Sequence, residues 1–244
     1  MRLQFLGTGG YHPNERRHTA CLLLPDLGVI LDAGSGFFRV AERLRMDDVQ
    51  IFLTHAHLDH IVGLTYSIVP FLTGQIRRAR LYSDDVYLRA VREHLYAQPI
   101  FPAQPLYEFV SLQDAVPLPD GGLLTHCRLK HPGGSIGYKL TWPERSLAYI
   151  TDTTVDGSYT EFIHGVDVLV HECYFPDDLS EWCDKTGHSH TSQVAALARD
   201  ANVGRLFLAH IDPQRADDDL VGIDAARKIF PATEVAHDLL EIEF

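Results

Sequence analysis

The segment Thr54–His60 constrains this chain more than any other, because it places four potential metal ligands within six residues. It reads Thr-His-Ala-His-Leu-Asp-His and follows the apolar run Val49–Leu53, which predicts a buried strand. Residues two apart in an extended loop project the same way, and Asp59 and His60 come one turn later, so the segment can serve two metal ions. Imidazole and carboxylate ligands without thiolate suit Zn²⁺, Mn²⁺ or Fe²⁺. We therefore expect metal chemistry at the end of a strand.

The composition is that of an ordinary folded protein. The chain has 244 residues, 45% hydrophobic and 22% charged, which excludes disordered, collagen-like and low-complexity classes. Its formal net charge of −12 is the wrong sign for a protein that holds phosphate backbones on a broad basic surface. The four cysteines are scattered, and no stretch resembles a signal peptide or membrane span, so we expect a cytoplasmic protein with no membrane partner.

Short apolar runs and helical spacings predict a layered α/β protein that forms one domain over residues 1–244. The expected strands are Leu3–Leu6, Ala20–Leu24, Val29–Leu31, Val49–Leu53, Tyr107–Val110, Leu123–Leu129, Ile136–Thr141, Ser146–Thr151, Val166–Val170 and Arg205–Ala209. The expected helices are Phe37–Leu44, Asp84–Leu95, Thr191–Asp200 and Ile223–Ile229. The segment from Thr65 to Thr125 is the hardest to interpret, and we expect it to supply substrate selectivity.

The spacing of His55, His57, Asp59 and His60 resembles the H-x-H-x-D-H motif of the metallo-β-lactamase superfamily. The resemblance implies an α/β fold, a four-layer αββα sandwich in which two mixed sheets pack face to face with helices outside. It also implies three later ligands at strand ends, in the order His, Asp, His. The matching residues, each at the end of an expected strand or just after it, are His131, Asp152 and His210.

By the same resemblance, the seven ligands divide between two divalent metal ions. One ion would be held by His55, His57 and His131, the other by Asp59, His60 and His210, with Asp152 bridging. Zn²⁺ is the first choice, with Mn²⁺ and Fe²⁺ as alternatives. Coordination lowers the pKa of a bridging water from about 15.7 toward about 7, which supplies a hydroxide at neutral pH, and Asp59 is a candidate to orient it.

Further motifs resemble the ribonuclease Z branch of this superfamily. They are the glycine-rich segments Phe5–Gly10 and Leu31–Gly36, and two loops that begin at His171 and Gly187. In that branch, the glutamate of the first loop orients the histidine of the second, which contacts the phosphate and protonates the leaving oxygen.

The matching residues in this chain are Glu172 and His188. His190 stands where the family has threonine, so it could replace or assist His188, or instead cap the helix that begins at Thr191.

The chain departs from that branch in a feature that bears on the substrate. Bacterial ribonuclease Z carries a long flexible arm that grips tRNA between the His and Asp matched by His131 and Asp152. Here Asp152 follows His131 by 21 positions, and two expected strands use most of the residues between them. The basic segment Arg77–Arg80 is interpreted as a solvated face.

The sequence therefore predicts a metal-dependent hydrolase, and favours a phosphodiesterase that acts on a small-molecule or nucleotide phosphodiester. The alternative is tRNA 3′ processing, in which a homodimer partner or another loop grips an RNA that the net charge of −12 does not favour. Two further alternatives are a lactone or thioester hydrolase and a non-hydrolytic metal-binding accessory protein.

Overall fold

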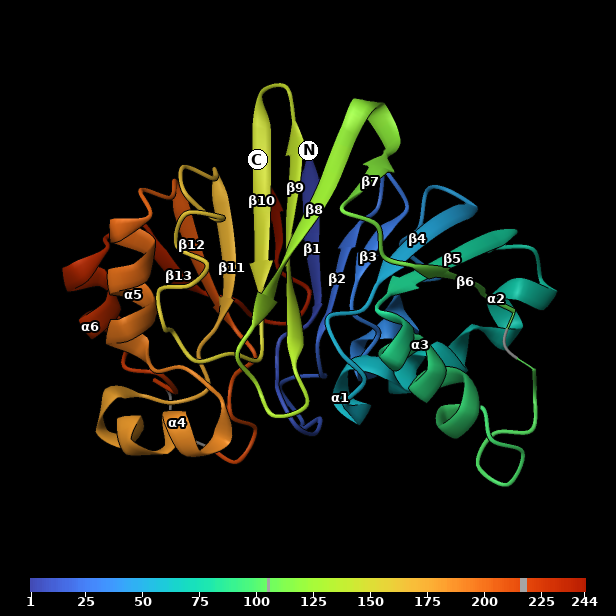
Figure 1. Ribbon diagram of the computed structural model, residues 1–244, viewed down its shortest axis with the longest axis horizontal. Coiled ribbons are helices and arrows are strands. Elements are labelled where there is room, and N and C mark those ends of the chain that lie inside the picture. The colour runs from blue at the N-terminus through green and yellow to red at the C-terminus, as the bar shows by residue number, and fades with distance from the viewer. Residues whose placement is uncertain (105, 216–218) are drawn as a thin grey trace.

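Two sheets of seven strands each form the centre of the molecule, which we describe from a computed structural model of residues 1–104, 106–215 and 219–244 (Figure 1). The first sheet has the order β14 (Glu241–Glu243), β1 (Arg2–Gly7), β2 (Cys21–Leu24), β3 (Val29–Leu31), β4 (Asp48–Phe52), β5 (Arg78–Ser83), β6 (Glu108–Ser111). The second has the order β13 (Thr233–Val235), β12 (Arg205–Ala209), β11 (Val168–Glu172), β10 (Arg145–Ile150), β9 (Ser135–Trp142), β8 (Gly122–Leu129), β7 (Ala115–Leu118). Both sheets are mixed, with parallel pairs such as β4·β5 and β11·β12 beside antiparallel hairpins.

The sheets pack face to face through alternate side chains of their strands. The rings of Phe5 and Phe207, one from each sheet, lie 5.6 Å apart, and those of Phe52 and Tyr138 lie 5.8 Å apart. All four side chains are buried in one continuous apolar cluster that both sheets share. Because strand residues alternate between faces, the remaining apolar residues point outward and need helices to cover them.

Helices cover both outer faces (Figure 1). On the second sheet lie α5 (Thr191–Asp200) and α6 (Ile223–Ile229), preceded by the short 3₁₀ turn Asp177–Trp182 and α4 (Cys183–Thr186). On the first lie α3 (Asp85–Ala90), extended by the π-helical turn Val91–Leu95, and the consecutive short helices α1 (Leu58–Ile61), Val62–Ser67 and α2 (Ile68–Leu72). A 3₁₀ turn also spans Pro119–Gly121. The predicted four-layer αββα architecture is confirmed.

One sequence prediction about local structure was wrong, and strand β5 was not predicted. The helix expected over Phe37–Leu44 is instead a 3₁₀ turn, Ser35–Arg39, which begins with the poor helix formers Ser and Gly. The basic segment lies mostly in the inner strand β5, yet the Arg77 and Arg78 side chains are exposed, as expected of a solvated face, and Arg78 and Arg80 pair with acids on the neighbouring strands β6 and β4. Alternation of arginine with apolar residues is the strand pattern that the charge had obscured.

The strands that run in the same direction end at a common edge of the two sheets. Strand β4 leads into the Thr54–His60 segment, and β8, β10 and β12 end within two residues of His131, Asp152 and His210. Parallel strands present their carboxyl ends together, so residues far apart in sequence meet there. No helix among the described residues has the length and apolar character needed to cross a bilayer.

Candidate metal centre and active site

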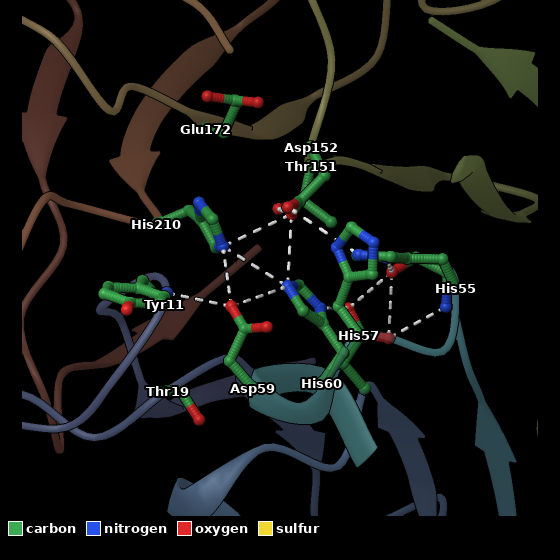
Figure 2. Close-up of polar contacts among 12 residues, drawn as sticks. Tyr11, Thr19, His55, His57, Asp59, His60, Thr151, Asp152, Glu172 and His210 are labelled. Atoms are coloured by element: carbon green, nitrogen blue, oxygen red, sulfur yellow. Dashed lines mark hydrogen bonds and ion pairs between the residues drawn. The ribbon is translucent and has the colours of Figure 1, made fainter. Parts of the chain in front are cut away.

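The seven expected ligands meet at this edge. Asp152 lies between His210 on one side and His55 and His57 on the other (Figure 2). Its Oδ1 lies 3.1 Å from His60 Nε2 and 3.3 Å from His210 Nε2. Its Oδ2 faces the other way, 3.7 Å from His55 Nε2 and 3.6 Å from His131 Nε2. One carboxylate thus presents an oxygen to each group, which is the arrangement of a bridging ligand.

The other two ligands complete the groups. His57 Nδ1 lies 3.4 Å from His131 Nε2, and the first group comprises His55, His57, His131 and Asp152. Asp59 Oδ2 lies 3.4 Å from both His60 Nε2 and His210 Nε2, and these three form the second group. Within each group the candidate ligand atoms all lie within 4.8 Å of one another.

The hydrogen-bonding pattern of these histidines is the one expected of ligands to divalent metal ions. The side-chain nitrogen His55 Nε2 is buried without a hydrogen-bond partner, although it faces the cluster. The Nδ1 atoms of His131 and His60 lie 2.9 Å from the Gly187 carbonyl and from Asp32 Oδ2, so each can donate there. That donation leaves the Nε2 lone pair of each ring directed at the cluster, as in metal-binding histidines.

Asp32 supports the cluster through hydrogen bonds to its ligand segment, a role that the sequence did not predict. This fully buried carboxylate accepts hydrogen bonds from the backbone and hydroxyl of Thr54, from His60 Nδ1 and from the Tyr149 hydroxyl, at 2.8–3.0 Å. It therefore fixes the start of the ligand segment and the orientation of one ligand. An acid at the end of β3, one residue after Leu31, was the available signal.

Backbone strain gathers at the same place. Of the seven described non-glycine residues with positive φ, four belong to the site or touch its ligands: Tyr11 (φ 58°), Asp32 (58°), Asp152 (51°) and His210 (53°). This conformation costs a residue with a Cβ roughly 1–2 kcal/mol. Strain of this kind persists where the surrounding structure fixes it, and it is concentrated at functional sites.

The charges of the cluster shift the pKa values of its members in opposite directions. Burial disfavours the imidazolium of His60, but the carboxylates of Asp152, Asp59 and Asp32 outweigh burial and raise its pKa well above the ordinary value. Burial, reinforced by His60, lowers the pKa of His55 well below it. Burial also opposes ionisation of Asp59, yet the neighbouring histidines hold its pKa far below the usual range.

Glu172 and His188 form a pair beside the cluster. His188 Nδ1 lies 3.1 Å from Glu172 Oε1, and the buried carboxylate also accepts from the backbone of Thr153 at 2.5 Å and of Ser189 at 3.1 Å. Burial lowers the pKa of His188, but the Glu172 charge outweighs it and raises that pKa to about 9. Glu172 thereby connects the loop after Asp152 to the loop that carries His188, and favours the protonated imidazole.

His190 is not brought to the site. Its Nδ1 bonds Asp177 Oδ1 at 2.8 Å, and the same carboxylate accepts from the backbone of Ser192. His190 occupies the N-cap position of α5, but its side chain makes no capping bond. The His190 ring is therefore bonded to the start of the 3₁₀ turn Asp177–Trp182, and sequence alone could not identify Asp177 as its partner.

A cavity of about 270 Å³ opens over the cluster. Metal-ligand candidates and His188 line it, together with Tyr11, Pro132, Tyr174 and Thr186. The Tyr174 ring stacks on His188, with centroids 4.6 Å apart and 15° between planes, and so fixes one wall. The cavity is large enough to hold a small group beside the cluster and the His188 imidazole.

Comparison with known proteins gives a family match and relatives that align over nearly their whole length. Residues 28–211 match the model of the β-lactamase superfamily domain. A ribonuclease Z of Methanosarcina acetivorans is 26% identical over 299 aligned positions, which cover 100% of this chain and 98% of that protein.

Solved structures share the fold. The metallo-β-lactamase fold protein YhfI from Bacillus subtilis superposes with a TM-score of 0.81 at 20% identity, over 99% of both chains. A diphosphatase of the PhnP family gives 0.75 at 23% identity, over 100% of this chain and 97% of the other. At these identities the superpositions establish the shared fold, and they do not by themselves establish a shared reaction.

Proposed function

The chain belongs to the β-lactamase superfamily, and from that premise we propose that it is a metal-dependent phosphodiesterase acting on a small or nucleotide-like phosphodiester. The observation that carries the proposal is the Glu172–His188 pair: His188 lines the same cavity as the metal-ligand candidates, and the buried Glu172 carboxylate holds its Nδ1 at 3.1 Å. We propose further that one domain, residues 1–244, supplies the whole site.

In this proposal two divalent ions, zinc by first choice, occupy the two groups of ligands. His55, His57 and His131 hold one, Asp59, His60 and His210 hold the other, and Asp152 serves both. Nitrogen and carboxylate donors without thiolate suit zinc, manganese or iron. The chemistry that such ions supply when bound is the activation of a water molecule and the neutralisation of phosphate charge.

The side chains of this chain would do the remaining work. Asp59, whose Oδ2 is fixed by the Tyr11 N–H at 2.8 Å, is placed to accept a hydrogen bond from the attacking water. His188 supplies a proton to the leaving oxygen, and Glu172 keeps that imidazole protonated and oriented through Nδ1. Hydrolysis of a lactone or thioester needs no such buried acid pair, which favours phosphodiester over acyl substrates.

Three observations favour a small substrate. Between His131 and Asp152 the chain is filled by the hairpin β9–β10, which leaves no arm in this fully described stretch. The alignment with the ribonuclease Z of Methanosarcina acetivorans spans 299 positions, whereas this chain has 244 residues, so that relative carries insertions that are absent here.

The third observation concerns the arginines. Arg77, Arg78 and Arg80 form ion pairs with acidic side chains, so they do not present a free basic patch to an RNA backbone.

Metal analysis followed by hydrolysis assays tests the proposal. The purified protein should contain bound divalent metal, and chelation should abolish hydrolysis of bis(p-nitrophenyl) phosphate, with recovery when metal is returned. A panel of phosphodiesters, phosphomonoesters, lactones and thioesters should show preference for the diesters. Undiminished activity after complete metal removal, or a preference for acyl substrates, would contradict the proposal.

tRNA 3′ processing is the second candidate, because the relatives that span the whole chain include proteins named ribonuclease Z. A 3′-extended precursor tRNA, incubated with the metal-loaded protein, decides the matter. Cleavage at the discriminator end at low enzyme concentration would favour this candidate over a small substrate. An uncut precursor at high enzyme concentration, alongside turnover of the small diesters, would eliminate it.

A further inference from the structure

Tyr11 presents an exposed aromatic ring at the cavity that the metal-ligand candidates line. Its side chain is 65% exposed. Within the described residues, the ring's aromatic contact is an edge-on approach to the adjacent His12 at 5.0 Å, and its hydroxyl makes no hydrogen bond. The other tyrosine of the cavity, Tyr174, already covers His188 with its ring. Packing against His188 therefore accounts for an aromatic ring at position 174, whereas packing within the described residues does not account for one at position 11.

The backbone holds Tyr11 firmly at this position. Its N–H donates to Asp59 Oδ2 at 2.8 Å, so Asp59 lies between Tyr11 and His60 (Figure 2). The preceding Gly10 donates to the Ile211 carbonyl at 3.0 Å and packs so closely under His210 that a Cβ would lie 2.5 Å from its ring. The loop is thus fixed on both sides by residues of the metal cluster.

This position is costly for a tyrosine. At φ 58° the residue adopts the left-handed region, where glycine is the natural choice. Glycine occupies the two preceding positions, so the loop already uses glycine freely. A large, exposed aromatic side chain in a strained backbone, beside a ligand carboxylate, indicates a contact with a molecule that enters the cavity.

We propose that Tyr11 is a specificity-determining residue that stacks on a flat ring, a nucleobase or aryl group, attached to the phosphate of the substrate. The inference rests on the proposed phosphodiesterase function and narrows its substrate class to nucleotide-like or aryl diesters. The cavity of about 270 Å³ accommodates the phosphate and the group next to it, and the ring of Tyr11 extends the wall toward solvent. Stacking suits this position because every base offers an apolar face without requiring a matched hydrogen-bond donor.

Binding of a reaction product gives a test that does not depend on turnover. The metal-loaded protein is titrated calorimetrically with adenosine 5′-monophosphate and with ribose 5-phosphate, which share the phosphate and sugar and differ in the base. Tyr11→Ala should weaken binding of the nucleotide by roughly 5- to 150-fold, the range of one base–aromatic stack, and leave ribose 5-phosphate within about twofold. Tyr11→Phe should behave as the wild type.

Tyr66→Ala is the matched control, since Tyr66 is also exposed but does not line the cavity. Metal content and thermal unfolding of each variant show whether the site is intact. An equal nucleotide affinity in the wild type and Tyr11→Ala, or an equal loss for both ligands, overturns the inference.

Hydrolysis assays separate this inference from the proposed function. If the loaded wild type hydrolyses diesters but Tyr11→Ala keeps the wild-type KM for nucleotide diesters, the function stands and the stacking role falls. If the wild type hydrolyses no diester yet binds the nucleotide through Tyr11, the function falls and the stacking role stands.

Discussion

Replacing Glu172 by Gln removes the charge that faces His188 while keeping the size of the side chain. At the Nδ1–Oε1 distance of 3.1 Å, opposite unit charges attract by about 5 kcal/mol at an effective dielectric constant of about 20. That energy corresponds to about four pKa units, and burial of the imidazole opposes it. The net result is the pKa of about 9 for His188, against about 6.5 for an ordinary histidine.

The sign of the effect follows from the raised pKa. The pair favours the protonated imidazole, so its contribution is complete below about pH 6.5 and is lost as the pH rises through about 9. At pH 7.5 a group with a pKa of about 9 is about 97% protonated, and a group at about 6.5 is about 9% protonated. In Glu172→Gln burial remains and the charge is gone, so His188 should titrate at or below about 6.5.

The assay is the pH profile of kcat with a nucleotide diester whose leaving group is an alkoxide. Relative to the wild type, Glu172→Gln should lose at least about tenfold at pH 7.5 and at least about twofold at pH 6.5, with the alkaline limb displaced toward acid. Bound divalent ions would lower the pKa of His188 in both proteins and so enlarge these losses, and the difference between the two profiles reports the carboxylate. His188→Ala should lose turnover far more than affinity and lack that limb.

Glu172 also accepts bonds from the backbone of Thr153 and Ser189, so metal content and thermal unfolding have to accompany the profiles. A loss of the same size at every pH, with metal content unchanged, would refute the role assigned to the charge. So would an alkaline limb that His188→Ala leaves in place.

Three other perturbations follow from the site. Asp32→Asn should weaken metal binding about 10- to 100-fold, because the carboxylate that orients His60 is lost; competition with a chelator measures it, and unchanged affinity would contradict it. Metal affinity should fall as the pH falls, because three carboxylates raise the pKa of His60 in the free protein and a metal ion has to displace that proton. The expected change is about tenfold per pH unit for each proton displaced, and a pH-independent affinity between about pH 6 and 8 would exclude this coupling. His190→Gln should keep kcat and KM within about twofold, because the half-exposed pair with Asp177 is a surface interaction; a loss as large as that of His188→Ala would return His190 to the catalytic machinery.

Much of the site could be predicted from the sequence, because its ligands follow a motif and strand ends. The segment Thr54–His60 carries its ligands in an extended loop and the turn that follows it, and His131, Asp152 and His210 each end or follow an apolar run. Such strand ends can be predicted from the local sequence, because a buried strand ends where polar residues begin. The fold class and the family, expected from these motifs, are confirmed.

Other features depended on contacts between distant segments. The resemblance favoured His188 as the partner of Glu172 and left open whether His190 replaces or assists it, and only the packing of their loop shows that His190 pairs with Asp177 instead. The bridging position of Asp152 arises because two sheets bring their strand ends to one edge. The choice of small substrates, the metal identity and a homodimer stay predictions.

The sequence by itself determined which chemical groups this protein can use and the order in which strands deliver them, because ligand type and strand period are local properties. The tertiary structure decided which groups share a charge or a hydrogen bond. Asp32 behind the ligands and Tyr11 at the rim illustrate the difference: each is an unremarkable residue in a glycine-rich turn until folding sets it against Asp59 or His60. Distance in space, which electrostatic and hydrogen-bond energies depend on, is fixed only by the fold.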